Sequence, residues 1–171
     1  MDVVPAALIR IVRLALAAIV VAGAGCRQPL QQARPSVETL AQDVLTSLEN
    51  RDTDRLRALA LDETEFREVI WPELPAARPE RNLTADYVWG EQRIKSEAGL
   101  QGVLSEHGGH ALRLVRVEFR GETTQQRTFL VRRNPVVVIR DASTGGEQTV
   151  KLFGSIVERD GGFKIFSYNV D

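Results

Sequence analysis

The stretch that decides the fold is residues 149–170, TVKLFGSIVERDGGFKIFSYNV, close to the end of the 171-residue chain. Two runs rich in β-branched, aliphatic and aromatic residues lie on either side of Asp160-Gly161-Gly162. An Asp-Gly pair between such runs is a strong signal for a β-hairpin, because glycine tolerates the positive φ that the tight turn requires. We therefore expect antiparallel strands over residues 149–158 and 163–170.

The segment before this hairpin is also strand-like. Val115, Val117 and Phe119 alternate with charged residues, which is the pattern of a strand with one buried face. Residues 128–131 predict another strand. Residues 136–139, Val-Val-Val-Ile, are apolar at every position, as expected for a strand covered on both faces.

The part of the chain that follows residue 35 has helical periodicity. Ser36 is a favourable N-cap residue. An apolar stripe with the spacing of one helix face comes after it: Val37, Leu40, Ala41, Val44, Leu45 and Leu48. Asp52 then predicts the cap of a short second helix.

Two further helices are expected before the strands. Asp62 and Glu65 match a capping box, so a third helix begins there. Residues 72–82 hold three prolines and predict a loop. Thr84 predicts the cap of a longer helix that ends at the two glycines of residues 108–109.

The order of elements is three or four helices followed by four or five antiparallel strands. This segregation predicts an α+β fold in which N-terminal helices pack on one face of a curved antiparallel sheet. The same order, with the ending Asp160-Gly-Gly-Phe-Lys-Ile-Phe166, resembles the NTF2-like (SnoaL-like, cone-shaped) superfamily over about residues 36–171. A cystatin-like or other helix-on-sheet domain is the nearest alternative.

Residues 1–25 have the features of a secretory signal peptide. Arg10 and Arg13 precede an uncharged run over residues 14–25, which is shorter than the ~20 apolar residues of a transmembrane helix. The single cysteine of the chain, Cys26, follows Gly-Ala-Gly at residues 23–25. That ending resembles the lipobox of bacterial lipoproteins, whose cysteine is diacylated and becomes the new N-terminus.

Two other interpretations of this segment stay open. Ordinary signal cleavage after Ala24 leaves Cys26 as a free thiol, and retention of the segment makes it an uncleaved anchor. The lipoprotein resemblance implies the cell envelope, and Arg27, in the position where Asp signals retention in the inner membrane of Gram-negative bacteria, favours the outer membrane. Residues 26–35 are expected to be a tether and residues 36–171 the single folded domain.

Composition limits the possible partners and cross-links. The chain has 22 Lys and Arg against 23 Asp and Glu, which excludes a broad electrostatic case for binding nucleic acid. One cysteine excludes an intramolecular disulfide. Seven arginines fall on or between the predicted strands: Arg113, Arg116, Arg120, Arg127, Arg132, Arg133 and Arg140. A solvated face of mixed charge is the first interpretation of them, and an anionic partner such as lipid headgroups is the alternative.

The two histidines of the chain, His107 and His110, flank a Gly-Gly pair. The sequence places no third ligand beside them, so we predict a solvated turn here and no metal site. No cofactor is expected either.

Trp71, Tyr87 and Trp89 are the tentative ligand-binding residues, because aromatic side chains commonly line small-molecule sites. Asp86 and Glu91 lie beside them on the predicted long helix. Enzymes of the NTF2-like superfamily place Asp, Tyr or His inside the cone, so the resemblance makes these two carboxylates the weak catalytic candidates.

The leading hypothesis from the sequence is an exported, membrane-anchored lipoprotein whose single domain binds a partner protein or a small apolar ligand without catalysis. The alternative is a small cavity-based isomerase, dehydratase or hydrolase that uses a carboxylate or a tyrosine. The resemblance also implies that pairing of two domains into a homodimer is an option.

Overall fold

The computed structural model describes residues 28–169, so the predicted signal peptide and Cys26 lie outside the described residues. The helices are α2 (Val37–Glu49), α3 (Thr53–Ala58), α4 (Glu63–Glu65) and α5 (Ala85–His107). Between α4 and α5 lie a π-helical turn and three 3-10 turns, over Phe66–Ile70, Trp71–Glu73, Pro75–Ala77 and Pro79–Arg81. The strands are β1 (Leu112–Phe119), β2 (Thr123–Gln125), β3 (Leu130–Arg133), β4 (Pro135–Asp141), β5 (Glu147–Val150), β6 (Ser155–Arg159) and β7 (Gly162–Ser167).

The strands form a bent antiparallel meander. The hydrogen-bonded orders are β1-β4-β5 and β2-β3-β6-β7, and each pairing is antiparallel. The two sheets are two halves of one bent sheet, because strands run from one half into the other. The strand β1 is followed by β2 after residues 120–122, and β3 is separated from β4 by Asn134 alone. Asn134 has a φ of 49°, a left-handed conformation that Asn tolerates better than most residues, and the sheet bends there.

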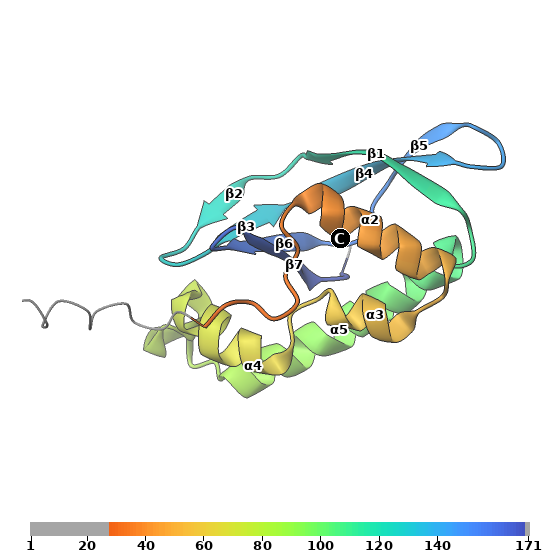
Figure 1. The fold of residues 1–171 in the computed structure, drawn as a ribbon. Coiled ribbons are helices and arrows are strands. Elements are labelled where there is room, and N and C mark those ends of the chain that lie inside the picture. The colour runs from red at the N-terminus through yellow and green to blue at the C-terminus, as the bar shows by residue number, and fades with distance from the viewer. Residues whose placement is uncertain (1–27, 170–171) are drawn as a thin grey trace, which may run out of the picture.

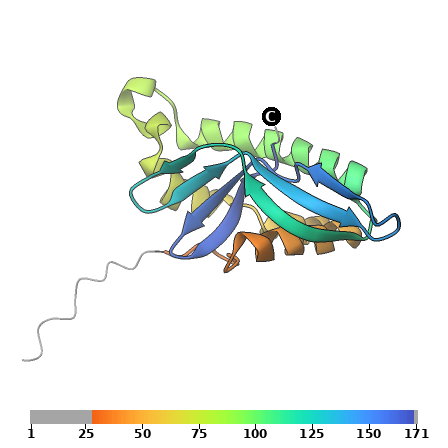
Figure 2. The same cartoon turned by 90° about the horizontal axis from the view of Figure 1, so that it is seen from above.

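Helices and strands form two layers. In Figure 1 the helices α3 and α5 lie below the strands, and α2 crosses in front of them. Seen from above, α2 and α5 run along opposite sides of the strands (Figure 2). The arrangement confirms the predicted α+β fold of helices on a curved antiparallel sheet.

The predicted helix caps are confirmed at the level of single hydrogen bonds. The Ser36 side chain accepts from Thr39 N at 3.1 Å, and Asp62 and Glu65 form a complete capping box. Thr84 caps α5. Each of these side chains satisfies a backbone N–H that has no partner within its own helix.

The predicted strand over residues 149–158 is wrong in one respect, because it is two strands, β5 and β6. Residues 151–154 separate them. Leu152 and Phe153 in this break are buried, and a Cβ on Gly154 would lie 1.9 Å from Asn169 O. The chain leaves one half of the sheet here and enters the other, because β5 pairs with β4 while β6 pairs with β3 and β7.

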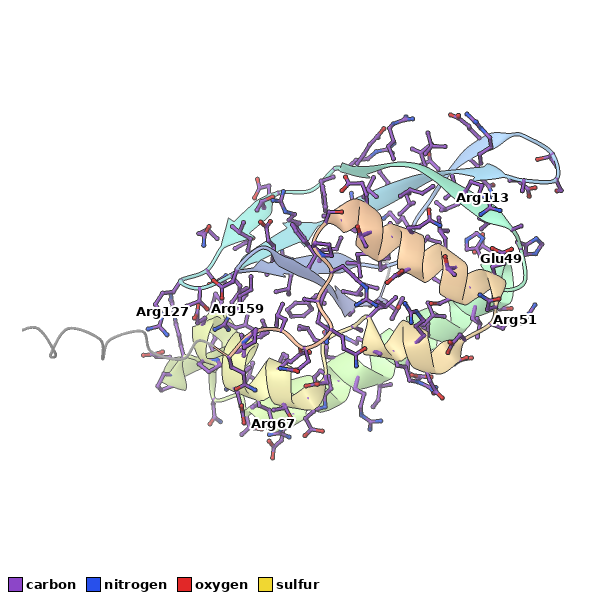
Figure 3. All side chains as sticks on the ribbon, in the orientation of Figure 1. Glu49, Arg51, Arg67, Arg113, Arg127 and Arg159 are labelled. Carbon is purple, nitrogen blue, oxygen red and sulfur yellow. The ribbon has the colours of Figure 1, made fainter. Side chains whose placement is uncertain are left out.

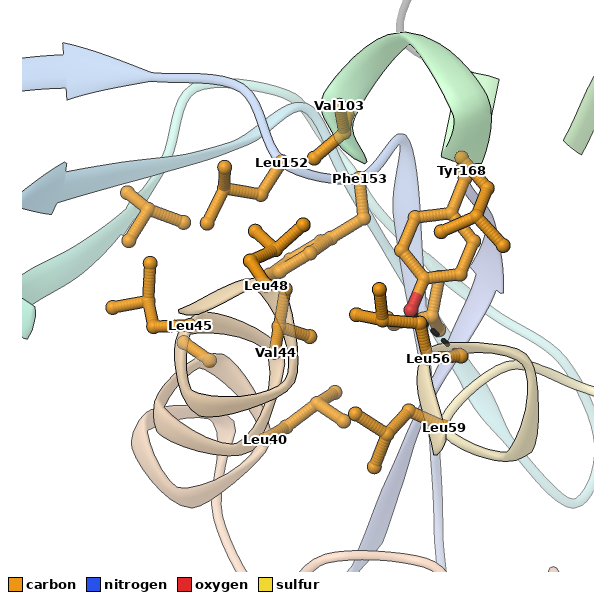
Figure 4. Packing of buried hydrophobic residues seen from close by; sticks show 14 of the residues in the cluster. Leu40, Val44, Leu45, Leu48, Leu56, Leu59, Val103, Leu152, Phe153 and Tyr168 are labelled. Atoms are coloured by element: carbon orange, nitrogen blue, oxygen red, sulfur yellow. Dashed lines mark hydrogen bonds between the residues drawn. The ribbon is translucent and has the colours of Figure 1, made fainter. Parts of the chain in front are cut away.

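Side chains from both layers fill the space between helices and strands. Val44 and Leu48 of α2 lie beside Phe153, which is in the break between β5 and β6, and Leu40 points toward Leu59 (Figure 4). The Tyr168 hydroxyl, inside this cluster, donates to Leu56 O at 2.7 Å. A second cluster lies beneath β3 and β6 and is formed mainly by residues before α5.

The segment predicted as a tether packs against the domain from Leu30 onward. Leu30 is 7% exposed and belongs to the second cluster. Arg34 pairs with Phe163 as an antiparallel bridge, and Ala60 pairs with Ile165 as a parallel one. These bridges cover the outer edge of β7, which otherwise presents unpaired backbone groups. The folded part of the chain therefore begins at Leu30 and not at Ser36.

Candidate functional site

A groove of about 240 Å³ opens on the surface between α3, α5 and the end of β7. Its apolar and aromatic lining residues are Ala60, Leu61, Trp89, Leu100, Phe166 and Tyr168. Its polar lining residues are Arg57, Gln92, Arg93, Ser96 and Glu97. An apolar floor with a few polar groups around it is the usual composition of a small-molecule site.

One face of α5 supplies most of this groove. Residues 89, 92, 93, 96, 97 and 100 of the helix all line it, and their spacing of three and four places them on one side of an α-helix. The Gln92 side chain donates to Phe166 O at 3.3 Å, and Tyr168 N donates to the Ser96 hydroxyl at 3.0 Å. These two bonds hold the helix against the end of β7 and so fix the groove's width.

A bidentate ion pair closes one side of the groove. Arg57 donates to both carboxylate oxygens of Glu97, at 2.7 and 3.1 Å. The hydrogen bond from Arg57 is the main cause that lowers the pKa of Glu97, and the same bond raises the pKa of Arg57. Glu97 therefore stays ionised at neutral pH, and a carboxylate of lowered pKa is a weak proton acceptor.

Trp89 lies at the boundary between the groove and the second hydrophobic cluster. Its ring centroid is 5.2 Å from that of Phe66. Its indole Nε1 is buried and has no hydrogen-bond acceptor within the described part of the chain. A buried donor without an acceptor costs free energy, so a ligand or a water that supplies an acceptor here is stabilised.

Of the three predicted binding residues, Trp89 alone lines the groove. Trp71 packs on the second cluster, with its ring 6.1 Å from that of Phe66. Tyr87 is 61% exposed. Successive helix residues point in different directions, so Tyr87 and Trp89 face opposite sides of α5.

The two weak catalytic candidates also lie outside the groove. Asp86 is 77% exposed and forms an ion pair with Arg67, and Glu91 is exposed. Neither carboxylate lines the groove. The residues that do line the groove were missed, although the 3–4 spacing of Gln92, Ser96 and their neighbours was visible in the sequence.

The histidine turn is packed more closely than predicted. His107 is 8% exposed, while His110 is exposed. The Arg51 guanidinium donates to Gly108 O at 2.7 Å, and Figure 3 shows Arg51 with Glu49 at the end of α2. Burial lowers the pKa of His107. Within residues 28–169, no group of three or more His, Cys, Asp or Glu side chains is arranged to hold a metal ion.

Comparison with known proteins does not assign a family or a function to this groove. No family model, curated protein or solved structure matches the chain. Among residues 28–169, no helix combines the length and the hydropathy needed to cross a membrane.

Proposed function

We propose that this chain is an exported lipoprotein, anchored to a membrane of the bacterial cell envelope through Cys26, whose NTF2-like domain binds a small apolar ligand. The groove between α3 and α5 carries the binding part of the proposal. Its apolar floor and polar sides suit a ligand with an apolar body and one or two polar atoms. The helix-then-meander order and the hairpin at residues 160–166 support the NTF2-like assignment.

The groove's volume sets the size of the ligand. At about 240 Å³ it is smaller than the roughly 300–1,000 Å³ of sites that enclose drug-sized molecules. We therefore propose a ligand that places one aromatic ring system or a short alkyl chain in the groove. Ser96, Gln92 and Arg93 line the groove and can donate to its polar atom.

Binding fits the groove better than catalysis does. Arg57 keeps Glu97 ionised, as its lowered pKa reflects. Burial raises the pKa of Tyr168 far above its usual value, and its hydroxyl is already bonded to Leu56 O. Acid–base catalysis requires groups whose pKa values lie near the working pH, and these two groups have moved away from it.

The groove is tested with the neutral fluorophore N-phenyl-1-naphthylamine and a pair of matched substitutions. Ala60→Leu fills the groove, while Ala98→Leu adds the same atoms at an exposed position of α5 that does not line it. We expect saturable fluorescence enhancement with the wild type and Ala98→Leu, and at least tenfold weaker binding with Ala60→Leu, roughly 1.4 kcal/mol. No binding to the wild type, or equal binding to all three proteins, contradicts the small-ligand proposal.

The anchor is tested separately by metabolic labelling with a fatty acid. The wild-type chain should take up label and fractionate with membranes, and Cys26→Ser should do neither. An unlabelled mature protein that begins before Cys26 and keeps a free thiol would contradict lipidation.

A further inference from the structure

The start of the folded domain limits how far the domain can stand from a membrane. Leu30 is buried in the second hydrophobic cluster, and only four residue steps separate it from Cys26. Fully extended, these steps span at most about 14 Å. If Cys26 carries the lipid anchor proposed above, the end of the domain next to Leu30 therefore lies at the height of the lipid headgroups.

Several segments distant in the sequence meet at that end of the molecule. The second cluster joins Leu30 to Trp71 and Leu74 of the turn segment and to Val88 at the start of α5. The β2–β3 loop reaches the same turn segment, because Thr128 N donates to Glu73 at 2.8 Å. In Figures 1 and 2 the β2–β3 loop, the β6–β7 hairpin and the start of α5 all lie at the end where the described chain begins.

Two large apolar side chains are exposed at this end. Leu83 is 40% exposed and Tyr87 is 61% exposed. Leu83 lies just before the N-cap Thr84, and Tyr87 lies in the first turn of α5. Tyrosine is enriched at membrane interfaces, where its ring meets the acyl boundary and its hydroxyl meets water.

Two arginines at this end form only long ion pairs with carboxylates among the described residues. The Arg127 side chain is 82% exposed, and the nearest carboxylate oxygen of Glu73 is 3.6 Å from its Nε. The Arg159 side chain is 7% exposed, yet its Nε has no hydrogen bond in the described structure, and its closest carboxylate is that of Asp160 at 3.6 Å. Figure 3 places Arg159 beside Arg127. The two arginines lie close to a paired position of neighbouring strands, where Leu130 of β3 pairs with Glu158 of β6.

We propose that this anchor-side end, formed by Leu30, Leu83, Tyr87, Arg127 and Arg159, rests on the bilayer surface. Arg127 faces the headgroup phosphates, and Leu83 and Tyr87 enter the interface. Arginine binds phosphate oxygens through a planar fork of donors, and the Arg127 side chain is exposed enough to reach them.

The carboxylates at the same end keep this surface from binding strongly by itself. Glu63 and Asp86 pair with Arg67, and Glu73 and Asp160 lie beside the two arginines. The surface is therefore close to neutral, and the anchor supplies the high local concentration that makes a weak contact effective. The long axis of α5 then points away from the bilayer, and the groove is held some distance above it.

The orientation is tested with the full chain in vesicles of phosphatidylethanolamine and phosphatidylglycerol. An environment-sensitive NBD label is attached at Tyr87→Cys or at Ser105→Cys, two exposed positions about 27 Å apart along α5. The labelled wild-type chain gives the background from Cys26. We expect doxyl-lipid quenching to be several-fold greater at position 87. Equal quenching at both positions, or stronger quenching at 105, overturns the proposal.

A second arm separates this surface from the anchor. The chain from residue 28, with an N-terminal hexahistidine tag on nickel-chelating lipids, is held near the bilayer without Cys26. Quenching at position 87 should persist there, fall several-fold with Arg127→Glu and stay unchanged with Arg113→Glu, an exposed arginine at the opposite end (Figure 3). If the full chain fails to float with vesicles but this arm succeeds, the anchor is wrong and the surface stands. If Arg127→Glu and Arg113→Glu behave alike, the surface is wrong.

Discussion

Glu65 on α4 and Lys164 on β7 form an ion pair inside the domain, with side chains 2% and 3% exposed and 2.6 Å between Oε2 and Nζ. The same carboxylate accepts backbone N–H groups from Gln31 and Asp62, at 2.6 and 3.0 Å. One side chain thus connects the N-terminal segment, a helix cap and the sheet. Such a network is costly to break, because each partner is buried away from water.

We predict that Lys164→Met destabilises the domain by about 3–5 kcal/mol, since it leaves the Glu65 carboxylate buried without a counter-charge. The double variant Glu65→Gln/Lys164→Met should be more stable than Lys164→Met alone, because a neutral amide removes the unpaired buried charge and its oxygen still accepts one of the two backbone N–H bonds. Urea unfolding at pH 7 measures both variants. Additive losses in the double variant would show that the two side chains do not interact.

His107 gives the domain a predictable response to acid. Burial lowers the pKa of His107 in the folded state below its ordinary value of 6.5. The unfolded chain therefore binds a proton more readily, so stability falls as the pH drops through 6.5 toward the lowered value. His107→Gln should reduce the loss of unfolding free energy between pH 7 and pH 5. His110→Gln, at an exposed position, serves as the control, and an unchanged pH dependence in His107→Gln would contradict this account.

At the scale of elements, α5 shows why a helix can carry glycines without breaking. Gly90, Gly99 and Gly102 weaken its helical propensity, yet the helix runs unbroken over Ala85–His107. A Cβ on Gly99 would lie 2.2 Å from Tyr168 O, while one on Gly102 would meet nothing within 4 Å. Gly99 therefore permits the close approach of the segment after β7, whereas Gly102 has no such role.

The two glycines should respond to alanine with opposite signs. Gly99→Ala should destabilise the domain by about 1–3 kcal/mol, because the backbone of Tyr168 must move. Gly102→Ala should stabilise it by about 0.5–1 kcal/mol through helix propensity and a less flexible unfolded chain. Thermal unfolding of both variants measures the difference. Stabilisation by Gly99→Ala would mean that helix and sheet are not in contact there.

At the scale of the whole molecule, the unit that folds includes the segment before α2. Leu30 fills a position in the second cluster, and Arg34 N donates to Phe163 O at 2.9 Å. Both residues belong to a stretch without apolar periodicity, so sequence patterns assign it to a linker. The segment predicted as a tether, residues 26–35, is therefore part of the folded unit from Leu30 onward.

A chain that starts at residue 28 should therefore be more stable than one that starts at Ser36. Loss of Leu30 burial alone accounts for about 1.5–3 kcal/mol, and the uncovered edge of β7 adds to it. Both truncated chains should melt cooperatively, because most of the first cluster lies after Ser36. Equal melting temperatures for the two chains would show that the segment contributes nothing to the fold.

Local sequence determined the elements of this protein, and tertiary packing determined its candidate site. The caps at Ser36, Asp62 and Thr84 and the turn at Asp160 are decided by residues close in sequence, so their patterns are readable without a fold. The break between β5 and β6, the pairing of Arg34 with Phe163 and the groove beside Trp89 each require residues far apart in the chain. These contacts form only when the sheet bends and α5 packs against β7. Periodicity along the sequence reports on local structure, so it does not reveal which distant residues come into contact.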